Sequence, residues 1–436
     1  MKYEARKKRK LTPKIIILLT IVLFVLTLIA YQTLKPKEIK QGITICSYDI
    51  NKTSSTLATQ YKDTFEINDY LYYGESLNLY AAKYNPGTND KIAGATLVLK
   101  NLCTQEESYF TANPLLDQQI PLDELKEGYY EVFINDLSDL KKKRLIYNGK
   151  LDSTFTTITR NGKRYDIKLI ADPELYKSET LTMDKSYIFI SVKESTNKEE
   201  YYDIVLDPFG NDQDFTLGIN LGNKANGLIE AEETYNSAIL LKTKLEEKGY
   251  KVLITRKDKD DVINTYGEEG RLSLAYKYHA KYYIQLAMNA SNYDYVRGTE
   301  IQYSAYSSKN LANAILFDLK KDTPLVMSSV YSKNESDNGL IQSSLVKGED
   351  GRAIYDNNMF IRELGGIGTQ AGTYSKTSRS NTFAKDNIYG VESLIISYGY
   401  LTNKEDVEVW INNKDKIIEV TANAIDKKLA TKVKTK

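Results

Sequence analysis

The sequence predicts a membrane-anchored protein of several domains, in which an all-β, sandwich-like region is followed by an α/β domain. Three observations indicate this architecture. Residues 1–34 hold a basic segment and an apolar run, residues 43–197 alternate between short apolar and polar stretches, and from Tyr201 onward strands and helices alternate. Because the hydrophobic period changes from two residues to about 3.6, we expect a domain boundary just before Tyr201.

The apolar run Ile15–Leu34 is long enough to cross a bilayer, since about 20 helical residues at roughly 1.5 Å each span a hydrocarbon core of about 30 Å. Residues 1–14 form a basic tail before it, and residues 35–42 form a linker after it. A cleaved signal peptide is the alternative, but it would be shorter and would end in a small-x-small site, which the exit Leu28–Gln32 lacks. We therefore expect a single-pass anchor in the cell membrane, with a cytoplasmic N-terminus and an extracytoplasmic bulk.

Composition excludes some partners and leaves the cysteines open. The chain carries 59 Lys+Arg and 58 Asp+Glu, a net charge of +1. The overall electrostatic field of the protein therefore does not favour binding of nucleic acid. Any partner must be recognised locally. Cys46 and Cys103 would lie in an oxidising compartment, where a disulfide is permitted. Two buried free thiols are the alternative, and the spacing indicates no metal site.

The region before residue 200 reads as half-buried antiparallel strands separated by Gly, Asn, Asp and Pro turns. We expect a β-sandwich-like domain over residues 43–140, and over residues 141–198 either a second β unit or an extension of the sandwich. Tyrosines are frequent here, among them Tyr70, Tyr72, Tyr73, Tyr129 and Tyr130. They could form a sugar-stacking face, or they could reflect the β propensity of a residue type that occurs 35 times in the chain.

Residues 201–430 alternate strand and helix, which predicts an α/β layer with a mixed, mostly parallel sheet flanked by helices. The expected strands are Asp203–Asp207, Tyr250–Thr255 and Tyr282–Leu286, and the expected helices are Glu232–Lys248, Arg271–Ala280, Asn310–Leu319 and Val407–Leu429. Active sites of such sheets lie beyond the carboxyl ends of the strands.

Several motifs of this region occur in a fixed order. They are Ile204–Asp212, Glu232–Asn236, Leu245–Arg256, Tyr283–Ala290, Gly298–Tyr303, Ser308–Ala312 and Ile395–Asn403. Together they resemble the zinc-dependent N-acetylmuramoyl-L-alanine amidases of bacterial cell walls, over roughly residues 203–430. The segment Leu245–Arg256 matches the family pattern Leu-Glu-x-x-Gly-Tyr-x-Val-x-x-Thr-Arg closely. The resemblance implies the amidase fold and its groove.

The residues with which the family performs hydrolysis are replaced in this chain. The resemblance places the two zinc histidines on Gly210 and Ala287 and the catalytic glutamate on Ser397, so only the glutamate ligand is retained, as Glu232. Glycine and alanine have no donor atom, and a serine cannot act as the carboxylate base. The one histidine of the chain, His279, stands near a predicted helix end, where a surface or dipole-complementing role is expected. We therefore expect no catalytic residue, no zinc and no other cofactor.

Two alternatives keep some chemistry at these positions. Five carboxylates lie in the sequence near the positions where the resemblance places the zinc ligands: Asp212, Asp214, Glu230, Glu232 and Glu233. They could hold calcium or magnesium, or they could be solvated and cap a helix. Glu363 is a candidate substitute acid or peptide contact. For ligand binding without a metal, the candidate residues are Asn211, Asp212, Asn289, Arg362 and Glu363.

The sequence thus predicts a catalytically degenerate amidase-like protein. Its expected role is to bind peptidoglycan or a cell-wall or membrane protein, as a scaffold or regulator, because binding and hydrolysis use separable groups. One alternative is a divergent active amidase with a replaced metal site or acid. Another is a structural spacer whose β domains carry partner binding.

Overall fold

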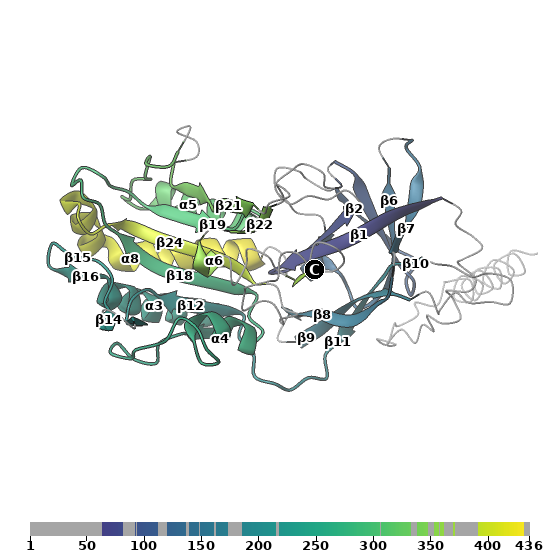
Figure 1. Ribbon diagram of the computed structural model, residues 1–436, viewed down its shortest axis with the longest axis horizontal. Coiled ribbons are helices and arrows are strands. Elements are labelled where there is room, and N and C mark those ends of the chain that lie inside the picture. Colours follow the sequence, from purple (N-terminus) through teal and green to yellow (C-terminus); the bar gives the residue numbers. More distant parts are fainter. Residues whose placement is uncertain are drawn as a thin grey trace, which may run out of the picture. The chain divides into compact units, whose positions relative to one another are not determined.

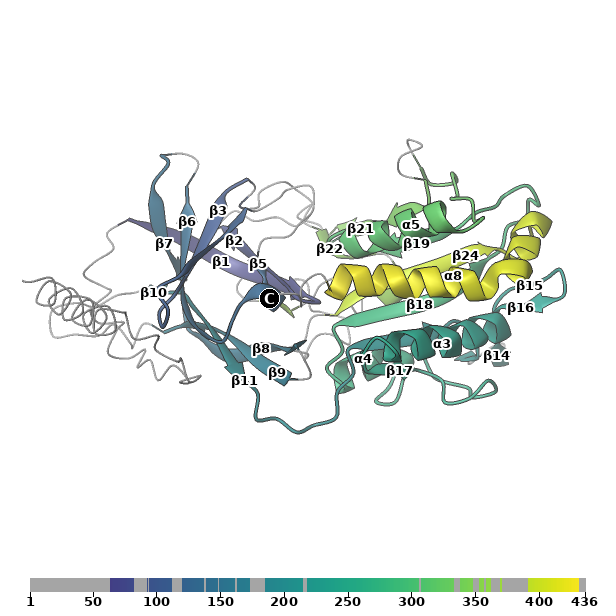
Figure 2. The same ribbon diagram turned by 180° about the vertical axis from the view of Figure 1, so that it is seen from behind.

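The structure is a computed structural model, shown in Figures 1 and 2. It describes residues 63–81, 92, 94–111, 120–136, 139–147, 149–160, 163–172, 185–214, 218–305, 307–332, 338–347, 353–356, 358–361, 369–370 and 391–430. Within those ranges no helix is both long and apolar enough to cross a membrane. The predicted tail, span and linker at residues 1–42 lie outside the described residues, as do Cys46, Arg362 and Glu363.

Strands occupy most of the described residues before residue 200, as the alternation predicts. They are β1 (Thr64–Tyr73), β2 (Ser76–Ala81), β3 (Thr96–Asn101), β4 (Glu107–Thr111), β5 (Ile120–Pro121), β6 (Gly128–Asn135), β7 (Lys142–Tyr147), β8 (Leu151–Arg160), β9 (Lys163–Ala171), β10 (Ser186–Tyr187) and β11 (Phe189–Glu194), with a short 3-10 helix at Leu122–Glu124.

These strands belong to one continuous sheet with the order β5-β2-β1-β7-β6-β11-β9-β8. Two of its pairings join strands that are separated in the sequence, and alternation alone does not reveal them: β6 pairs with β11, and β1 runs parallel to β7. The β-rich character of this region agrees with the alternation, and its division into a sandwich and a second β unit stays a prediction.

The tyrosines of this region are mainly core residues. Tyr70, Tyr72, Tyr73 and Tyr130 are all buried, with 7% exposure at most, so these four cannot offer a ring to a sugar, and of the two interpretations the structural one holds for them. Cys103, in the turn after β3, is disulfide-bonded.

The second region contains the expected alternation of strands and helices. Its elements are β12 (Ile204–Pro208), β13 (Asp212–Asp214), β14 (Gly218–Asn220), β15 (Lys224–Ala225), β16 (Leu228–Ile229), α3 (Glu230–Glu246), β17 (Val252–Ile254), α4 (Arg271–Lys277), β18 (Tyr282–Asn289), β19 (Glu300–Tyr303), α5 (Asn310–Asp322), β20 (Leu340–Gln342), β21 (Leu345–Lys347), β22 (Ala353–Asp356), α6 (Met359–Ile361), β24 (Glu392–Tyr400) and α8 (Lys404–Ala430). The short strand β23 (Thr369–Gln370) pairs instead with β1 of the first sheet.

The main sheet has the order β17-β12-β18-β24-β19-β20. β17, β12, β18 and β24 are parallel to one another, β19 is antiparallel to β24, and β20 is parallel to β19. This confirms the predicted mixed, mostly parallel sheet flanked by helices.

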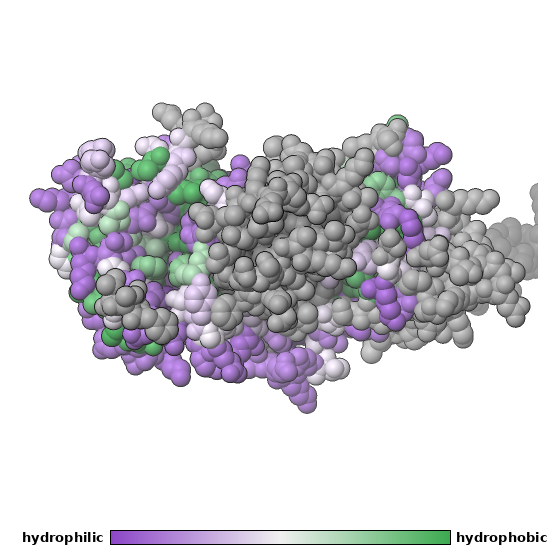
Figure 3. Space-filling view, in the orientation of Figure 1, coloured by the Kyte–Doolittle hydropathy of each residue, from purple (hydrophilic) through white to green (hydrophobic). Residues whose placement is uncertain are grey.

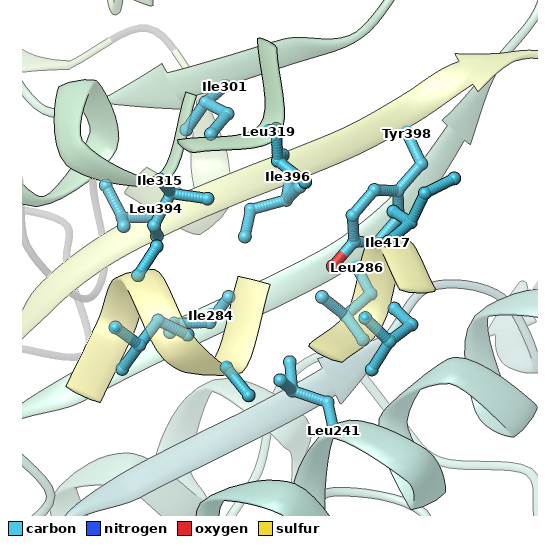
Figure 4. Close-up of a cluster of buried hydrophobic side chains, with 14 of the residues drawn as sticks. Leu241, Ile284, Leu286, Ile301, Ile315, Leu319, Leu394, Ile396, Tyr398 and Ile417 are labelled. Carbon is cyan, nitrogen blue, oxygen red and sulfur yellow. The ribbon is translucent and has the colours of Figure 1, made fainter. Parts of the chain in front are cut away.

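The two faces of the sheet bury different side chains because consecutive residues of a strand point to opposite sides. One face packs against α3, α5 and α8, and its cluster is drawn in Figure 4 with Leu241, Ile284, Ile396 and Ile417 among its members. The other face packs near α4 and α6 through a smaller cluster that includes Tyr283. The smaller cluster covers less of its face, and this leaves room for a groove there.

Large apolar side chains also remain on the surface. On the face that Figure 3 shows, apolar residues of the described part are interspersed with hydrophilic ones rather than gathered in a single patch. Phe317 is 61% exposed and Ile411 is 58% exposed, on different helices. Scattered exposure of this kind is normal for a folded domain.

A buried ion pair connects β12, the first strand of the α/β domain, to α4. The guanidinium of Arg271, at the start of α4, lies 3.1 Å from Asp207 Oδ1 at the end of β12, and both side chains have 0% exposure. Arg271 also lies 2.9 Å from Asp212 Oδ1 and donates to the carbonyl oxygen of Gly210 at 2.8 Å. One arginine thus binds three points of the chain between the end of β12 and the start of β13.

Asp207 is bound from the neighbouring strands as well. It accepts hydrogen bonds from Thr255 Oγ1 at 2.6 Å, from Gln285 Nε2 at 2.8 Å and from the hydroxyl of Tyr283. Its carboxylate therefore connects β12 with β18 and with the residue after β17. A buried charge is tolerated only when it is paired and hydrogen-bonded in this way.

We predict that Arg271→Leu lowers the free energy of unfolding of the α/β domain by about 3–5 kcal/mol, because it leaves the buried carboxylate of Asp207 without its cation. Trp410 is the one tryptophan of the chain and is 1% exposed in α8. Its fluorescence during urea unfolding therefore reports on this domain.

The matched control is Lys277→Leu at the other end of α4, where the pair with Glu269 is exposed. Exposed pairs contribute little, so its unfolding midpoint should equal that of the unchanged protein. Equal midpoints for the Arg271 and Lys277 variants would contradict the importance assigned to the buried pair.

Candidate functional site

A groove of about 980 Å³ lies over the sheet on the side opposite α5 and α8. Its floor consists of alternate residues of three adjacent strands: Gln285 and Ala287 of β18, Ile395 and Ser397 of β24, and Glu300 and Gln302 of β19. The pairing register places Ala287 and Glu300 on either side of Ser397, and Gln285 and Gln302 on either side of Ile395. The floor is therefore a grid of six side chains, most of them polar.

Glu230, the first residue of α3, lines the groove although its exposure is 1%. Its Oε2 accepts hydrogen bonds from the backbone N of Asn223 at 2.8 Å and from Asn223 Nδ2 at 2.9 Å. Its Oε1 accepts from the backbone N of Met288 at 2.8 Å. Burial raises the pKa of Glu230 from 4.5 to about 7, and the three hydrogen bonds work against that rise.

A second buried carboxylate, Glu300, lies in the same groove with an exposure of 6%. Its Oε2 accepts a hydrogen bond from Asn289 Nδ2 at 2.7 Å, and its Oε1 accepts from the hydroxyl of Tyr400 at 2.8 Å. The donors to Glu300 are neutral, as are those to Glu230. The groove thus holds two carboxylates that are stabilised by dipoles rather than by the side chain of an arginine or lysine.

The groove also has an apolar part. Phe209, which follows β12, meets Phe360 of α6 edge to face with ring centroids 6.4 Å apart, and Leu340 and Ile341 of β20 line the groove as well. Tyr331, which is 68% exposed, lines the groove too. A ligand with both apolar and hydrogen-bonding faces fits such a lining.

A family model described as N-acetylmuramoyl-L-alanine amidase matches residues 204–427, which is more than half of the chain. The chain belongs to the N-acetylmuramoyl-L-alanine amidase family. No curated protein matches the chain.

Solved amidase structures are similar to part of the chain at low identity. Cwp6 from Clostridium difficile shares 18% identity over 54% of this chain and 30% of its own, with a TM-score of 0.36. The catalytic domain of CwlV from Bacillus (Paenibacillus) polymyxa var. colistinus shares 16% identity over 53% of this chain and 98% of its own, with a TM-score of 0.35. An N-acetylmuramoyl-L-alanine amidase from Clostridium difficile 630 shares 18% identity over 55% of this chain and 100% of its own, also with a TM-score of 0.35.

In this amidase domain the structure brings only some of the predicted site residues together. Ala287, Ser397 and Asn289 line the groove. Glu232 does not: its side chain is 45% exposed and pairs with Lys259 at 3.1 Å. The groove position belongs to Glu230, which corrects that prediction.

The spacing of buried residues along α3 indicates which glutamate faces the groove. Ala238, Leu241 and Leu245 form the buried stripe of α3. Continued toward the N-terminus in steps of three and four residues, that stripe passes through Thr234 and reaches Glu230, whereas Glu232 points away. Matching the spacing of a short motif placed the glutamate on the wrong face of the helix.

Gly210, where the first zinc histidine was placed, lies beside the groove rather than among its lining residues. Its φ is +93°, and a Cβ built there would lie 2.6 Å from the Cβ of Ala231. A larger residue at this position is opposed both by its backbone conformation and by the first turn of α3.

The other candidates after β12 have structural partners. Asn211 has a φ of 54° and donates through Nδ2 to the carbonyl oxygen of Lys259 at 2.8 Å. Asp212 pairs with Arg271, and burial raises the pKa of Asp212 from 3.8 to about 6. Neither lines the groove. His279, with a φ of 54°, lies just before β18 and hence at the amino end of that strand, away from its carboxyl end.

The residues present do not fit the zinc ion of the family. In the part of the chain that the structure describes, no group of at least three His, Cys, Asp or Glu side chains could hold a metal ion. The carboxylate of Glu230 lines the groove, and both of its oxygens accept backbone N–H groups. Zinc prefers tetrahedral sites with nitrogen, sulfur or carboxylate ligands, which this donor set does not provide.

The carboxylates considered for calcium or magnesium do not converge on one point either. Glu232 pairs with Lys259, and Asp212 pairs with Arg271. Glu233 accepts hydrogen bonds from Trp410 Nε1 at 2.9 Å and from Lys414 Nζ at 2.8 Å. Those three side chains stabilise the helices and loops around the groove.

We predict that Glu230 makes stability fall as the pH rises from 4.5 to about 7. Between these values the folded protein holds a proton on Glu230 that the unfolded chain has released, so raising the pH favours unfolding. In Glu230→Gln this dependence is absent. Urea unfolding followed by Trp410 fluorescence, at several pH values in this window, measures the difference.

Asp212 is present in both the unchanged protein and the Glu230→Gln variant. Its contribution to the pH dependence therefore cancels when the two unfolding free energies are subtracted. The stability of the unchanged protein relative to the Gln variant should decrease steadily with pH. A difference that is constant across the window would show that Glu230 titrates as an ordinary carboxyl group.

Proposed function

We propose that the protein is a catalytically degenerate member of the amidase family that binds peptidoglycan through this groove and acts as a scaffold or regulator in the cell wall. The observation that carries the proposal is the composition of the groove. Its frame and its polar lining are present, while Gly210, Ala287 and Ser397 stand where the resemblance places the two metal ligands and the base. Binding and hydrolysis use different groups, so the first can persist without the second.

The lining supports a binding role for an amide- and hydroxyl-bearing polymer. Side-chain amides both donate and accept hydrogen bonds, and the groove contains several, from Asn223, Gln285, Asn289, Gln302 and Asn358. Apolar and aromatic side chains lie beside them. Polar groups of this kind fix the orientation of a ligand, and apolar surface adds affinity.

The apolar run at residues 15–34 supports a second part of the proposal, namely that the protein is anchored in the cell membrane with its bulk outside the cytoplasm. Such an anchor would keep the groove at the membrane side of the wall. Deleting residues 1–34 should move the protein from the membrane fraction to the soluble fraction, and a deletion variant that stays with the membrane would contradict the anchor.

We predict that the purified protein sediments with isolated cell walls and releases no soluble fragments from them. Ala287→Met should weaken the sedimentation about tenfold, because the longer side chain enters the floor of the groove, where Ala287 is 8% exposed. Ala314→Met, in α5 on the other side of the sheet, is the matched control and should bind normally. Trp410 fluorescence shows whether both variants are folded.

The same experiment separates the alternatives. Release of soluble peptide from the walls, together with a stoichiometric metal in the purified protein, would identify a divergent active amidase. Wall binding that is unchanged by Ala287→Met would exclude the groove as the binding site, and absence of wall binding would favour a protein partner or a spacer role.

A further inference from the structure

Three side-chain amides of the groove have a fixed orientation, because a buried carboxyl group binds the NH₂ group of each one. Asn223 Nδ2 donates to Glu230 at 2.9 Å, Gln285 Nε2 donates to Asp207 at 2.8 Å, and Asn289 Nδ2 donates to Glu300 at 2.7 Å. A carboxylate accepts and cannot donate, so the amide nitrogen must face it. The carbonyl oxygen of each amide is then the atom left for another partner.

No described protein donor binds the three carbonyl oxygens, Asn223 Oδ1, Gln285 Oε1 and Asn289 Oδ1, and all three residues line the groove. At these three positions the groove offers hydrogen-bond acceptors, which require donors from a ligand. Hydroxyl groups and secondary amide N–H groups are such donors. A carboxylate has none.

The charged side chains that line the groove also disfavour a carboxylate-bearing ligand. Two acidic residues, Glu230 and Glu300, line the groove, and Lys309 is the one basic residue among its described lining residues. Two acidic groups in a partly buried space disfavour the approach of an anionic ligand. The peptides of peptidoglycan carry carboxylates, which these acidic groups disfavour, whereas its sugars carry hydroxyl and acetamide groups, which can donate to the three oxygens.

The groove also contains one exposed aromatic ring that a ligand could contact. Tyr331 lines the groove and is 68% exposed, so its face is open to a ligand. The ring of a tyrosine presents an apolar face with a polar tip, which suits the apolar face of a pyranose and its hydroxyl edge.

We propose that the groove selects the glycan strand, a neutral chain of N-acetylated amino sugars, and discriminates against the carboxylate-bearing peptide. This proposal rests on the proposed function and names the part of the polymer that is recognised. The amide oxygens of Asn223, Gln285 and Asn289 accept from sugar hydroxyl and acetamide groups, and the ring of Tyr331 stacks on a sugar.

The test is isothermal titration of the full-length protein with two probes. One is a tetramer of β-1,4-linked N-acetylglucosamine, and the other is a synthetic L-alanyl-D-glutamyl tripeptide with free carboxylates. We expect the tetramer to bind and the tripeptide not to bind. Because the tetramer is uncharged, raising the salt concentration about tenfold should change its Kd less than twofold.

Two variants with matched controls localise the effect. Tyr331→Ala should weaken tetramer binding about three- to tenfold, while Tyr109→Ala, at 61% exposure in β4, should have no effect. Asn289→Ala removes one acceptor and should weaken binding at least about fivefold, whereas Asn313→Ala, on the exposed face of α5, should leave it unchanged. Trp410 fluorescence shows that each variant is folded.

The possible outcomes separate this proposal from the proposed function. Binding of the tripeptide but not the tetramer, by a protein that also sediments with cell walls, overturns the glycan preference and leaves peptidoglycan binding intact. Binding of neither probe, with walls still bound, also overturns the glycan preference. Binding of neither probe and no wall binding overturns both. Stronger, salt-dependent binding of the de-N-acetylated tetramer would show that the groove selects a cation instead.

Discussion

The ion pair between Asp207 and Arg271 is the interaction on which the geometry around the groove depends. It closes the end of the first strand onto α4 and holds the carbonyl oxygen of Gly210. Through Gln285 it also reaches the floor of the groove. Two charges with 0% exposure have no access to water, so their position is determined by each other and by the groups that bind them. The chain between β12 and β13 has little freedom as a result.

Glu230 connects the loop before α3 with β18. Its carboxylate accepts hydrogen bonds from the backbone N–H groups of Asn223 and Met288. Asn223 Nδ2 lies 2.9 Å from the carboxylate and 3.0 Å from the carbonyl oxygen of Met288. A neutral amide thus bridges two acceptors, one on α3 and one on β18.

The α/β domain was predictable because its motifs are long and its strands and helices have distinct periods. Leu245–Arg256 alone specifies a helix end, a turn and a strand. The β region was predictable only as a set of strands, since the pairing of β6 with β11 joins segments far apart in sequence. At the site, Ala287 and Ser397 lie side by side in the groove because strand register fixes which side chains share a face. Glu232 was incorrect because a motif at a helix start has no such constraint.

The conformation of Gly210 limits which side chains its position can accept. With φ at +93° and the Cβ of Ala231 2.6 Å from where its own Cβ would be, a substitution to histidine would cost stability. The loop after β12 and the first turn of α3 fit each other only while this position has no side chain, so a larger residue there requires a shift of the α3 start.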